Sequence, residues 1–244
     1  MKSAALILAA GKGTRMGGKY PKVMFELAGR PLIDFVLDSS EKAGLSPIVV
    51  VAGFRKDILI EHLHDRDVII QEQPEQKGTG HAVACGLPGL EGFNGNLFIL
   101  CGDVPLLPSE LLTQMQKYHN ENNMSATVLT IELDDPGKYG RILRDANGDL
   151  HSIVEAADAD EDVLAISEIN SGIYVFDIDE LRNFIHSLGS DNAQAEFYLT
   201  DLIEILRKNG RRVGAFLYNG PQEHLAGINR PEELEHLNNF LERK

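Results

Sequence analysis

Short apolar runs alternate with amphipathic stretches along the first half of the chain. The runs at residues 4–8 and 48–52 are uninterrupted and aliphatic or β-branched, a pattern typical of buried strands. Residues 31–44 instead carry apolar side chains at helical spacing and end at a glycine, which predicts a helix. The alternation continues, and it predicts strands at 68–70, 96–100 and 126–131 and helices at 56–63, 79–87 and 108–118.

This order of elements predicts βαβ units, a parallel sheet and right-handed crossovers. Ligands of open parallel sheets bind at the carboxyl ends of the strands. A glycine-rich loop follows the first strand, and Asp103 follows the strand at 96–100. We therefore expect the loop and Asp103 at the same edge of the sheet.

The second half of the chain has a different pattern. Two stretches, 141–144 and 150–155, flank a turn that contains Asn147-Gly148, which predicts a β-hairpin. We expect a loop in the acidic segment 158–162 and a closing helix at 231–241, with proline in its first turn. No repeat, low-complexity tract or linker divides the chain, so we expect a single domain over residues 1–244. The remaining predicted elements are a strand at 171–176, helices at 178–187 and 197–209, and a strand at 213–218.

Composition and charge argue against several classes of protein. Of the 244 residues, 43% are hydrophobic and 25% are charged, as in ordinary soluble globular proteins. The net charge of −14 argues against nonspecific binding to nucleic acid or to an anionic membrane. The first apolar run is too short for a signal peptide, and no stretch approaches the roughly 18 apolar residues of a membrane span. The two cysteines, Cys85 and Cys101, make no disulfide framework and fit a reducing cytoplasm.

Positive charge is concentrated in one loop of this acidic chain. The sequence LAAGKGTRM runs from residue 8 to residue 16 and is followed by Pro21-Lys22. Its glycines let backbone amides approach phosphate, and its basic residues supply charge there. It is not a P-loop, because Gly13 is followed by threonine, and not a dinucleotide fingerprint, because Met16 replaces the third glycine. The basic residues are Lys12, Arg15, Lys19 and Lys22.

Further motifs follow this loop along the chain. They are QPEQKGTGHA at 73–82, GDVPL at 102–106, YGRI at 139–142, IVE at 153–155, EINSGIY at 168–174, AQAEFYLTD at 193–201 and GINRPEEL at 227–234. With the loop, they resemble the sugar-1-phosphate nucleotidyltransferases. The resemblance is greatest to the uridylyltransferase domain of the bacterial bifunctional N-acetylglucosamine-1-phosphate uridylyltransferase/glucosamine-1-phosphate acetyltransferases, and it spans nearly the whole chain.

The resemblance implies a fold and a reaction. The fold is α/β, a three-layer Rossmann-like nucleotidyltransferase fold with a mixed, mostly parallel central sheet. Its nucleotide-binding part is expected at about residues 1–120, its sugar-phosphate-binding part at about 121–230, and a closing helix at 231–242. The implied reaction is Mg²⁺-dependent, and it converts UTP and an N-acetylhexosamine 1-phosphate to UDP-N-acetylglucosamine, or a closely related UDP-sugar, and pyrophosphate. Such an enzyme is expected to be a cytoplasmic transferase of nucleotide-sugar and cell-wall biosynthesis.

The resemblance also assigns roles to individual residues. It implies phosphate binding and catalysis for Arg15 and Lys22, and Mg²⁺ ligation for Asp103 and Asn229. The Gln73 amide is expected at the uracil edge, and the nucleotide site as a whole is Leu8, Ala9, Ala10, Gly11, Gly13, Gln73, Gly78 and Thr79. The sugar phosphate is expected to contact Gly140, Glu155, Asn170, Tyr198 and, more weakly, Thr200.

In the implied mechanism an oxygen of the sugar 1-phosphate attacks the α-phosphorus of UTP in line, and pyrophosphate leaves. The nucleophile is already anionic at neutral pH, so no general base and no covalent protein nucleophile is required. The main cost is the repulsion between two anions. Mg²⁺, Arg15 and Lys22 are expected to offset it.

The sequence departs from the family pattern at three points. Cys101 precedes the Gly-Asp pair where the family often has an aromatic residue, and Phe197 stands where a second tyrosine is usual. The hexapeptide repeats of the acetyltransferase part do not occur in these 244 residues, so we predict no acetyl transfer. The chain is expected to be either a stand-alone uridylyltransferase or a fragment.

Several alternatives stay open. A cytidylyltransferase of isoprenoid synthesis shares the glycine-rich loop but lacks the GTGHA and GDVPL segments. A UTP- or dTTP-dependent glucose-1-phosphate enzyme differs only by small changes in the sugar pocket. A non-catalytic nucleotide-sugar-binding protein is disfavoured, because all the candidate metal and phosphate residues are present. Taken singly, Asp103 and Asn229 also suit helix caps, and Gln73 suits a surface position. The sequence gives no oligomeric state.

Overall fold

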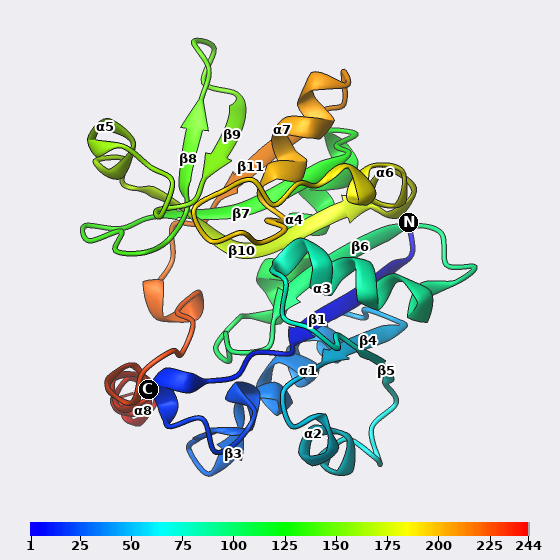
Figure 1. Cartoon of the computed structure of the whole chain (residues 1–244), viewed down its shortest axis with the longest axis vertical. Coiled ribbons are helices and arrows are strands. Elements are labelled where there is room, and N and C mark those ends of the chain that lie inside the picture. Colours follow the sequence, from blue (N-terminus) through cyan, green and yellow to red (C-terminus); the bar gives the residue numbers. More distant parts are fainter. Residues whose placement is uncertain (244) are drawn as a thin grey trace.

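A nine-stranded mixed sheet forms the centre of the computed structural model, which describes residues 1–243 (Figure 1). Its main path is β11 (Val213–Leu217), β7 (Ala126–Glu132), β10 (Glu168–Asp177), β6 (Asn96–Cys101), β1 (Ser3–Ala9), β4 (Ile48–Ala52) and β5 (Ile69–Glu72). Strand β10 is antiparallel to β6 and β7, and the other pairs along this path are parallel. The predicted hairpin, formed by β8 (Arg141–Arg144) and β9 (Leu150–Val154), extends from β10.

Helices cover both faces of this sheet, because the central strands are apolar on both sides. Along β1, Ala5 and Ile7 pack into one core, whereas Ala4 and Leu6 pack into the other. The first core is closed by α1 (Leu32–Lys42), α2 (Lys56–His62) and α4 (Ser109–Glu121). The second is closed by α3 (Thr79–Gly86), α6 (Ile178–Phe184) and α7 (Asp201–Lys208). The predicted three-layer α/β fold with a mixed, mostly parallel sheet is confirmed.

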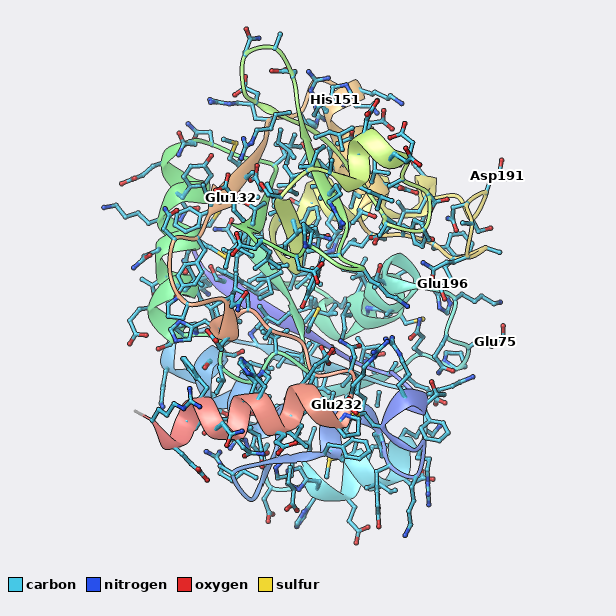
Figure 2. All side chains as sticks on the ribbon, turned by 90° about the vertical axis from the view of Figure 1, so that its left-hand side faces the viewer. Glu75, Glu132, His151, Asp191, Glu196 and Glu232 are labelled. Atoms are coloured by element: carbon cyan, nitrogen blue, oxygen red, sulfur yellow. The ribbon has the colours of Figure 1, made fainter. Side chains whose placement is uncertain are left out.

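The last helix, α8 (Pro231–Glu242), packs away from the sheet. Its Leu237 joins Ile228, Leu27 and Leu32 in a small separate core beneath the N-terminal loops. In Figure 2, α8 crosses the lower half of the molecule facing the viewer, with Glu232 near its first turn. This packing anchors the segment just before α8, which carries Asn229. Within residues 1–243, no helix combines the length and the apolar character needed to cross a bilayer.

The carboxyl ends of β1 and β6 lie side by side. Leu8 pairs with Cys101, and the Gly102 amide donates to the Leu8 carbonyl at 3.0 Å. The glycine-rich loop leaves β1 at this point and contains two 3₁₀ turns, η1 (Thr14–Met16) and η2 (Lys22–Met24). A small hairpin of β2 (Glu26–Leu27) and β3 (Arg30–Pro31) follows, which the sequence pattern did not predict.

The prediction of a loop over 158–162 is wrong in part, because the short helix α5 (Glu161–Leu164) begins inside it. The Asp160 carboxylate accepts the Val163 amide at 2.9 Å and so caps this helix. Acidic side chains are also favourable in a first helical turn, because they face the positive end of the helix dipole. The acidic composition therefore favours a helix start here.

The helix predicted at 197–209 begins only at Asp201, so its predicted start is wrong. The Phe197 amide donates to Lys77, and the Phe197 carbonyl accepts from Gly80, each at 2.8 Å. The Leu199 amide donates to the Thr79 hydroxyl at 3.0 Å. These bonds tie the segment to the loop before α3, and a helix would need the same backbone groups.

Gly78 lies where that segment touches the loop. Its φ is +105°, and an added Cβ would lie 2.6 Å from the Phe197 carbonyl oxygen. We expect Gly78→Ala to lower the free energy of unfolding by about 3 kcal/mol, from backbone strain and clash together. The thermal midpoint, followed by circular dichroism, is expected to fall by roughly 6–12 °C.

Gly92→Ala is the matched control for this prediction. Gly92 has a φ of +74° but nothing within 4 Å of an added Cβ. It is therefore expected to lose only the strain of the left-handed backbone, about 1 kcal/mol. Equal losses in the two variants would contradict the close packing at Gly78.

Candidate active site

A cavity of about 300 Å³ opens at the carboxyl ends of β1 and β6. Lys22 and Asp103 line it, as do these members of the predicted nucleotide site: Leu8, Ala10, Gly11, Gln73, Gly78 and Thr79. Ala9 is buried in β1 beside the cavity, and Gly13 packs against the Lys22 backbone. Sequence reasoning missed Val23, Gln76, Ala82 and Glu196 as lining residues, although Gln76 stands inside a motif that it had singled out.

The charged centre of the cavity joins three segments that are distant in sequence. The Lys22 ammonium pairs with the Asp103 carboxylate, and it donates to the Asn229 side-chain oxygen at 2.6 Å. The Lys22 and Asp103 side chains are each only 17% exposed. The Ile228 amide donates to the Asp103 carbonyl at 3.0 Å, which fixes the two outer segments to each other. Burial strengthens such a pairing, because little water screens it.

This arrangement fits a cation. A carboxylate oxygen and an amide oxygen already converge on one positive charge, and both are hard ligands. Within residues 1–243, no group of three or more histidine, cysteine or carboxylate side chains is placed to hold a metal. A divalent ion at this point would therefore take two protein oxygens and complete its shell with phosphate and water. Asn229 and Asp103 do not cap the helices that follow them, because the N-cap of α8 is Arg230 and the N-cap of α4 is Pro108.

Arg15 does not share this centre. It lies exposed on η1, outside the residues that line the cavity. The other loop cations, Lys12 and Lys19, are exposed as well. The structure thus brings Lys22 and Asp103 together and leaves Arg15 at the surface of the same loop.

Gln73 lies at the opposite end of the cavity, and it is buried rather than at the surface. Its amide nitrogen lies 3.1 Å from the Gly78 carbonyl oxygen and 3.0 Å from the His81 Nδ1. The Thr79 hydroxyl accepts from Leu199 and so belongs to the link with the second half of the chain. The contacts with Gly78 and His81 therefore hold the Gln73 side-chain amide in place without a ligand.

The predicted sugar-phosphate residues gather beside a second cavity of about 310 Å³. Glu155 and Tyr198 line it, and Thr200 donates to the Glu155 carboxylate at 3.1 Å. The Asn170 amide donates to the Gly140 carbonyl at 2.9 Å, and a Cβ at Gly140 would lie 3.4 Å from Glu155. Four of the five residues are thus joined by direct contacts, and Tyr198 lines the same cavity as Glu155. Further carboxylates line the same cavity, from Asp158, Asp191, Asp201 and Glu204.

Burial and the neighbouring carboxylates raise the pKa values of two residues that line this cavity. Burial raises the pKa of Glu155 above its ordinary value of 4.5, and neighbouring carboxylates add to the effect. Burial and the Asp158 carboxylate raise the pKa of Tyr198 to about 12, so its hydroxyl keeps its proton. That hydroxyl is buried and has no hydrogen-bond partner within residues 1–243.

A bulge in β10 connects the two cavities. The register shifts between Asn170 and Tyr174, and Gly172 has a φ of +79°. The Asn170 side-chain oxygen accepts the Gly172 amide at 2.9 Å, and the Gly172 carbonyl accepts the Cys101 thiol at 3.4 Å. Cys101 lines the first cavity, so the bulge links Asn170, one of the predicted sugar-phosphate residues, to that cavity. Tyr174, which the sequence did not single out, is buried near Glu155 and Asn170, and its pKa is raised by burial.

A family model for the MobA-like NTP transferase domain matches residues 5–167. The chain belongs to this family. It is therefore a nucleotidyltransferase, and the glycine-rich loop and the Asp103 turn both lie within the matched region.

Curated relatives cover nearly the whole chain. It is 41% identical over 234 residues to "Bifunctional protein GlmU" of Clostridium botulinum (strain Loch Maree / Type A3) and 43% identical over 244 residues to the protein of that name from Clostridioides difficile (strain 630). The GlmU of Trichlorobacter lovleyi is 44% identical over 243 residues. These matches cover 96%, 100% and 99% of this chain but 51%, 52% and 53% of the relatives. The chain spans about half the length of the curated relatives it matches.

A solved structure shares the fold. It is a UDP-glucose pyrophosphorylase complexed with UDP-glucose, with a TM-score of 0.79, 20% sequence identity and complete coverage of both chains (100% each). At this level of identity the likeness shows the common architecture.

In this MobA-like NTP transferase, the lining of the first cavity offers little nucleophilic chemistry. Burial and the Asp103 carboxylate raise the pKa of the Cys101 thiol to about 12. A thiol that keeps its proton is a poor nucleophile. Among the described residues that line this cavity, Lys22 is the one with a cationic side chain.

Glu155 gives a stability prediction whose sign depends on pH. The folded protein binds the Glu155 proton more tightly than the unfolded chain does, so unfolding free energy is lost as pH rises above 4.5 through the raised pKa. Glu155→Gln removes this charge and keeps an acceptor for Thr200. Calorimetry should find the variant more heat-stable than wild type at about pH 7.5 and equal to it at about pH 4.

Glu132→Gln is the matched control, because Glu132 is exposed at the end of β7 (Figure 2). It is expected to leave the thermal midpoint unchanged at both pH values. A gain for Glu155→Gln that persists undiminished at acid pH would rule out the charge as its source.

Proposed function

We propose that this protein is a uridylyltransferase that uses UTP and an N-acetylhexosamine 1-phosphate to make a UDP-N-acetylhexosamine and pyrophosphate. The likeness to the GlmU proteins supports UDP-N-acetylglucosamine as the proposed product. The observation that carries the proposal is the convergence of Asp103 and Asn229 on Lys22, at a cavity that Lys22, Asp103 and two glycines line. A charge centre of this kind suits the transfer of a phosphoryl-type group between two anions.

The two cavities suggest how the substrates lie. The nucleotide would occupy the part formed by about residues 1–120, with its base at Gln73 and its phosphates at Lys22. The sugar phosphate would occupy the part formed by about residues 121–230. Carboxylates there repel a phosphate and accept hydrogen bonds from sugar hydroxyls, with Glu155 as the acceptor nearest to Gly140. The sugar ring is therefore expected to face Glu155 and Tyr198, and its phosphate to face Lys22.

Mg²⁺ is the proposed cofactor, held by Asp103 and Asn229. When bound, it would neutralise phosphate charge and lower the repulsion between the two substrates. The ammonium of Lys22 would then leave its two oxygen partners and pair with phosphate, aided by Arg15 if η1 moves toward the cavity. Gly11 and Gly13 lie close to Lys22, where a Cβ at Gly13 would come within 3.2 Å of the Lys22 Cα, and the loop amides there would contact phosphate.

The proposed chemical step is a single in-line displacement. An oxygen of the sugar 1-phosphate forms a bond to the α-phosphorus of UTP, the bond from that phosphorus to the bridging oxygen breaks, and pyrophosphate leaves with the electron pair. The attacking oxygen already carries charge at neutral pH, so no protein base takes up a proton. The neutral Cys101 thiol plays no covalent part.

A pyrophosphate-release screen tests this function. UTP with N-acetylglucosamine 1-phosphate is expected to be the best pair when compared with CTP, ATP, dTTP and glucose 1-phosphate, and release should stop when divalent metal is chelated. Glucose 1-phosphate is the most serious competitor, because the structural neighbour is a UDP-glucose enzyme. Metal-independent release, or release with no sugar phosphate present, would defeat the proposal.

Two variants test the charge centre in the same assay. Asp103→Ala and Lys22→Ala are each expected to lower turnover by roughly 100-fold or more, the scale of losing one preorganised charge. Lys117→Ala, at an exposed position on α4, is the matched control and should keep full turnover. Turnover within about tenfold of wild type in both site variants would contradict the assigned roles.

A binding measurement tests the cation site without turnover. In the ligand-free protein the Lys22 ammonium occupies both oxygen partners, and a divalent ion must displace it. Lys22→Met is therefore expected to bind Mn²⁺ about tenfold more tightly than wild type in the absence of nucleotide, measured by electron paramagnetic resonance. Lys117→Met should bind Mn²⁺ as wild type does. Weaker or unchanged binding in Lys22→Met would place the metal elsewhere.

A further inference from the structure

The Gln73 side chain is held by two acceptors, and this fixes which of its atoms faces the first cavity. Its nitrogen lies 3.1 Å from the Gly78 carbonyl oxygen, which can only accept. The amide must therefore turn its nitrogen toward Gly78. The second hydrogen of that nitrogen points to the His81 Nδ1, at 3.0 Å. Both hydrogens are thus used inside the protein.

The Gln73 oxygen is the atom left for a ligand. Within residues 1–243 no hydrogen bond to that oxygen forms, while the side chain is only 3% exposed and lines the cavity. The oxygen atom is not itself sealed from solvent, so it can accept a hydrogen bond from a ligand in the cavity. The Gln73 side-chain oxygen therefore gives this end of the cavity a hydrogen-bond acceptor.

His81 contacts the Gln73 amide from outside the first cavity. It belongs to the first turn of α3 and lines a separate cavity of about 190 Å³ on the other side, not the nucleotide cavity. Its Nε2 lies 3.6 Å from the Cys85 sulfur, and its ring packs 6.4 Å from the ring of Phe197. To accept from Gln73, Nδ1 must be bare, and the ring proton must sit on Nε2 and face Cys85.

We propose that His81 is a positioning residue that sets nucleobase specificity by keeping the Gln73 oxygen toward the cavity. A base whose ring nitrogen carries hydrogen, such as uracil or thymine at N3, would donate to that oxygen. Cytosine presents a bare N3 at the same edge, and two acceptors would face each other. This inference rests on the proposed function, because it names how that site selects its nucleotide.

Steady-state kinetics with UTP, dTTP and CTP test the proposal on three variants. His81→Leu removes the acceptor and is expected to lower the UTP-to-CTP ratio of kcat/KM by about tenfold, mostly through KM for UTP, on the scale of one hydrogen bond. The UTP-to-dTTP ratio should stay unchanged, because both bases present the same N3–H. His81→Asn restores an oxygen acceptor near the position of Nδ1 and should recover most of the selectivity. His186→Leu is the matched control, because His186 is an exposed histidine that lines the same 190 Å³ cavity as His81.

The kinetic results distinguish a failure of this proposal from a failure of the proposed function. An unchanged UTP-to-CTP ratio in His81→Leu, or an equal loss for all three nucleotides, would overturn the proposal, because a merely structural histidine would affect every nucleotide alike. A wild-type protein that makes pyrophosphate from CTP as readily as from UTP would instead defeat the proposed uridylyl transfer.

A spectroscopic measurement on the wild-type protein needs neither turnover nor a stable variant. Long-range ¹⁵N–¹H spectra of the histidine rings report which nitrogen carries the proton. His81 is expected to show a proton on Nε2 and a bare Nδ1, with and without UTP. A proton on Nδ1 would overturn the proposal whatever the activity of the protein.

Discussion

The pairing of the Lys22 ammonium with Asp103 and Asn229 is the interaction on which the site depends. These residues come from the glycine-rich loop, from the turn after β6 and from the segment before α8. Each segment is held by its own packing, with α8 anchored through Leu237 in a small core. The contact is mostly buried, so the charges act on each other and on a ligand with little screening. The fixed position of these charges is what the site offers to an anionic ligand.

Two further connections link this centre to the second cavity. Backbone bonds between the loop before α3 and the segment at Phe197 join the two halves of the chain, and close approach at Gly78 makes them possible. The bulge at Gly172 brings Asn170, one of the predicted sugar-phosphate residues, close to Cys101 in the lining of the first cavity. The first cavity contains the Lys22 ammonium and the second is lined by carboxylates, which under the proposed function would give a sugar phosphate a preferred direction. A UDP-glucose pyrophosphorylase shares this fold at 20% sequence identity.

The sequence predicted the elements whose pattern is local. Buried strands such as β1 and β4 and amphipathic helices such as α1 are determined by their own residues, and adjacent strand ends then follow from parallel topology. The start of α7 was mispredicted, because hydrogen bonds to Lys77, Thr79 and Gly80 override local helix preference. The motifs at 73–82 and 193–201 contain Gln76 and Glu196, but the place of these two residues in the cavity lining depends on how the two segments pack together, and it was missed. The motifs named most of the candidate residues, but only the structure separates Lys22, which is paired in the cavity, from Arg15, which is exposed.

The central claim is that the uridylyl group passes directly from one bound anion to another, guided by fixed charge and not by a protein nucleophile. The stereochemistry at phosphorus tests this most directly. A single diastereomer of UTP with sulfur on its α-phosphorus would be turned over with N-acetylglucosamine 1-phosphate, and the configuration of the diphosphate product determined by ³¹P NMR. One in-line displacement predicts inversion. Retention would require two displacements through a covalent uridylyl-protein, and it would contradict the account.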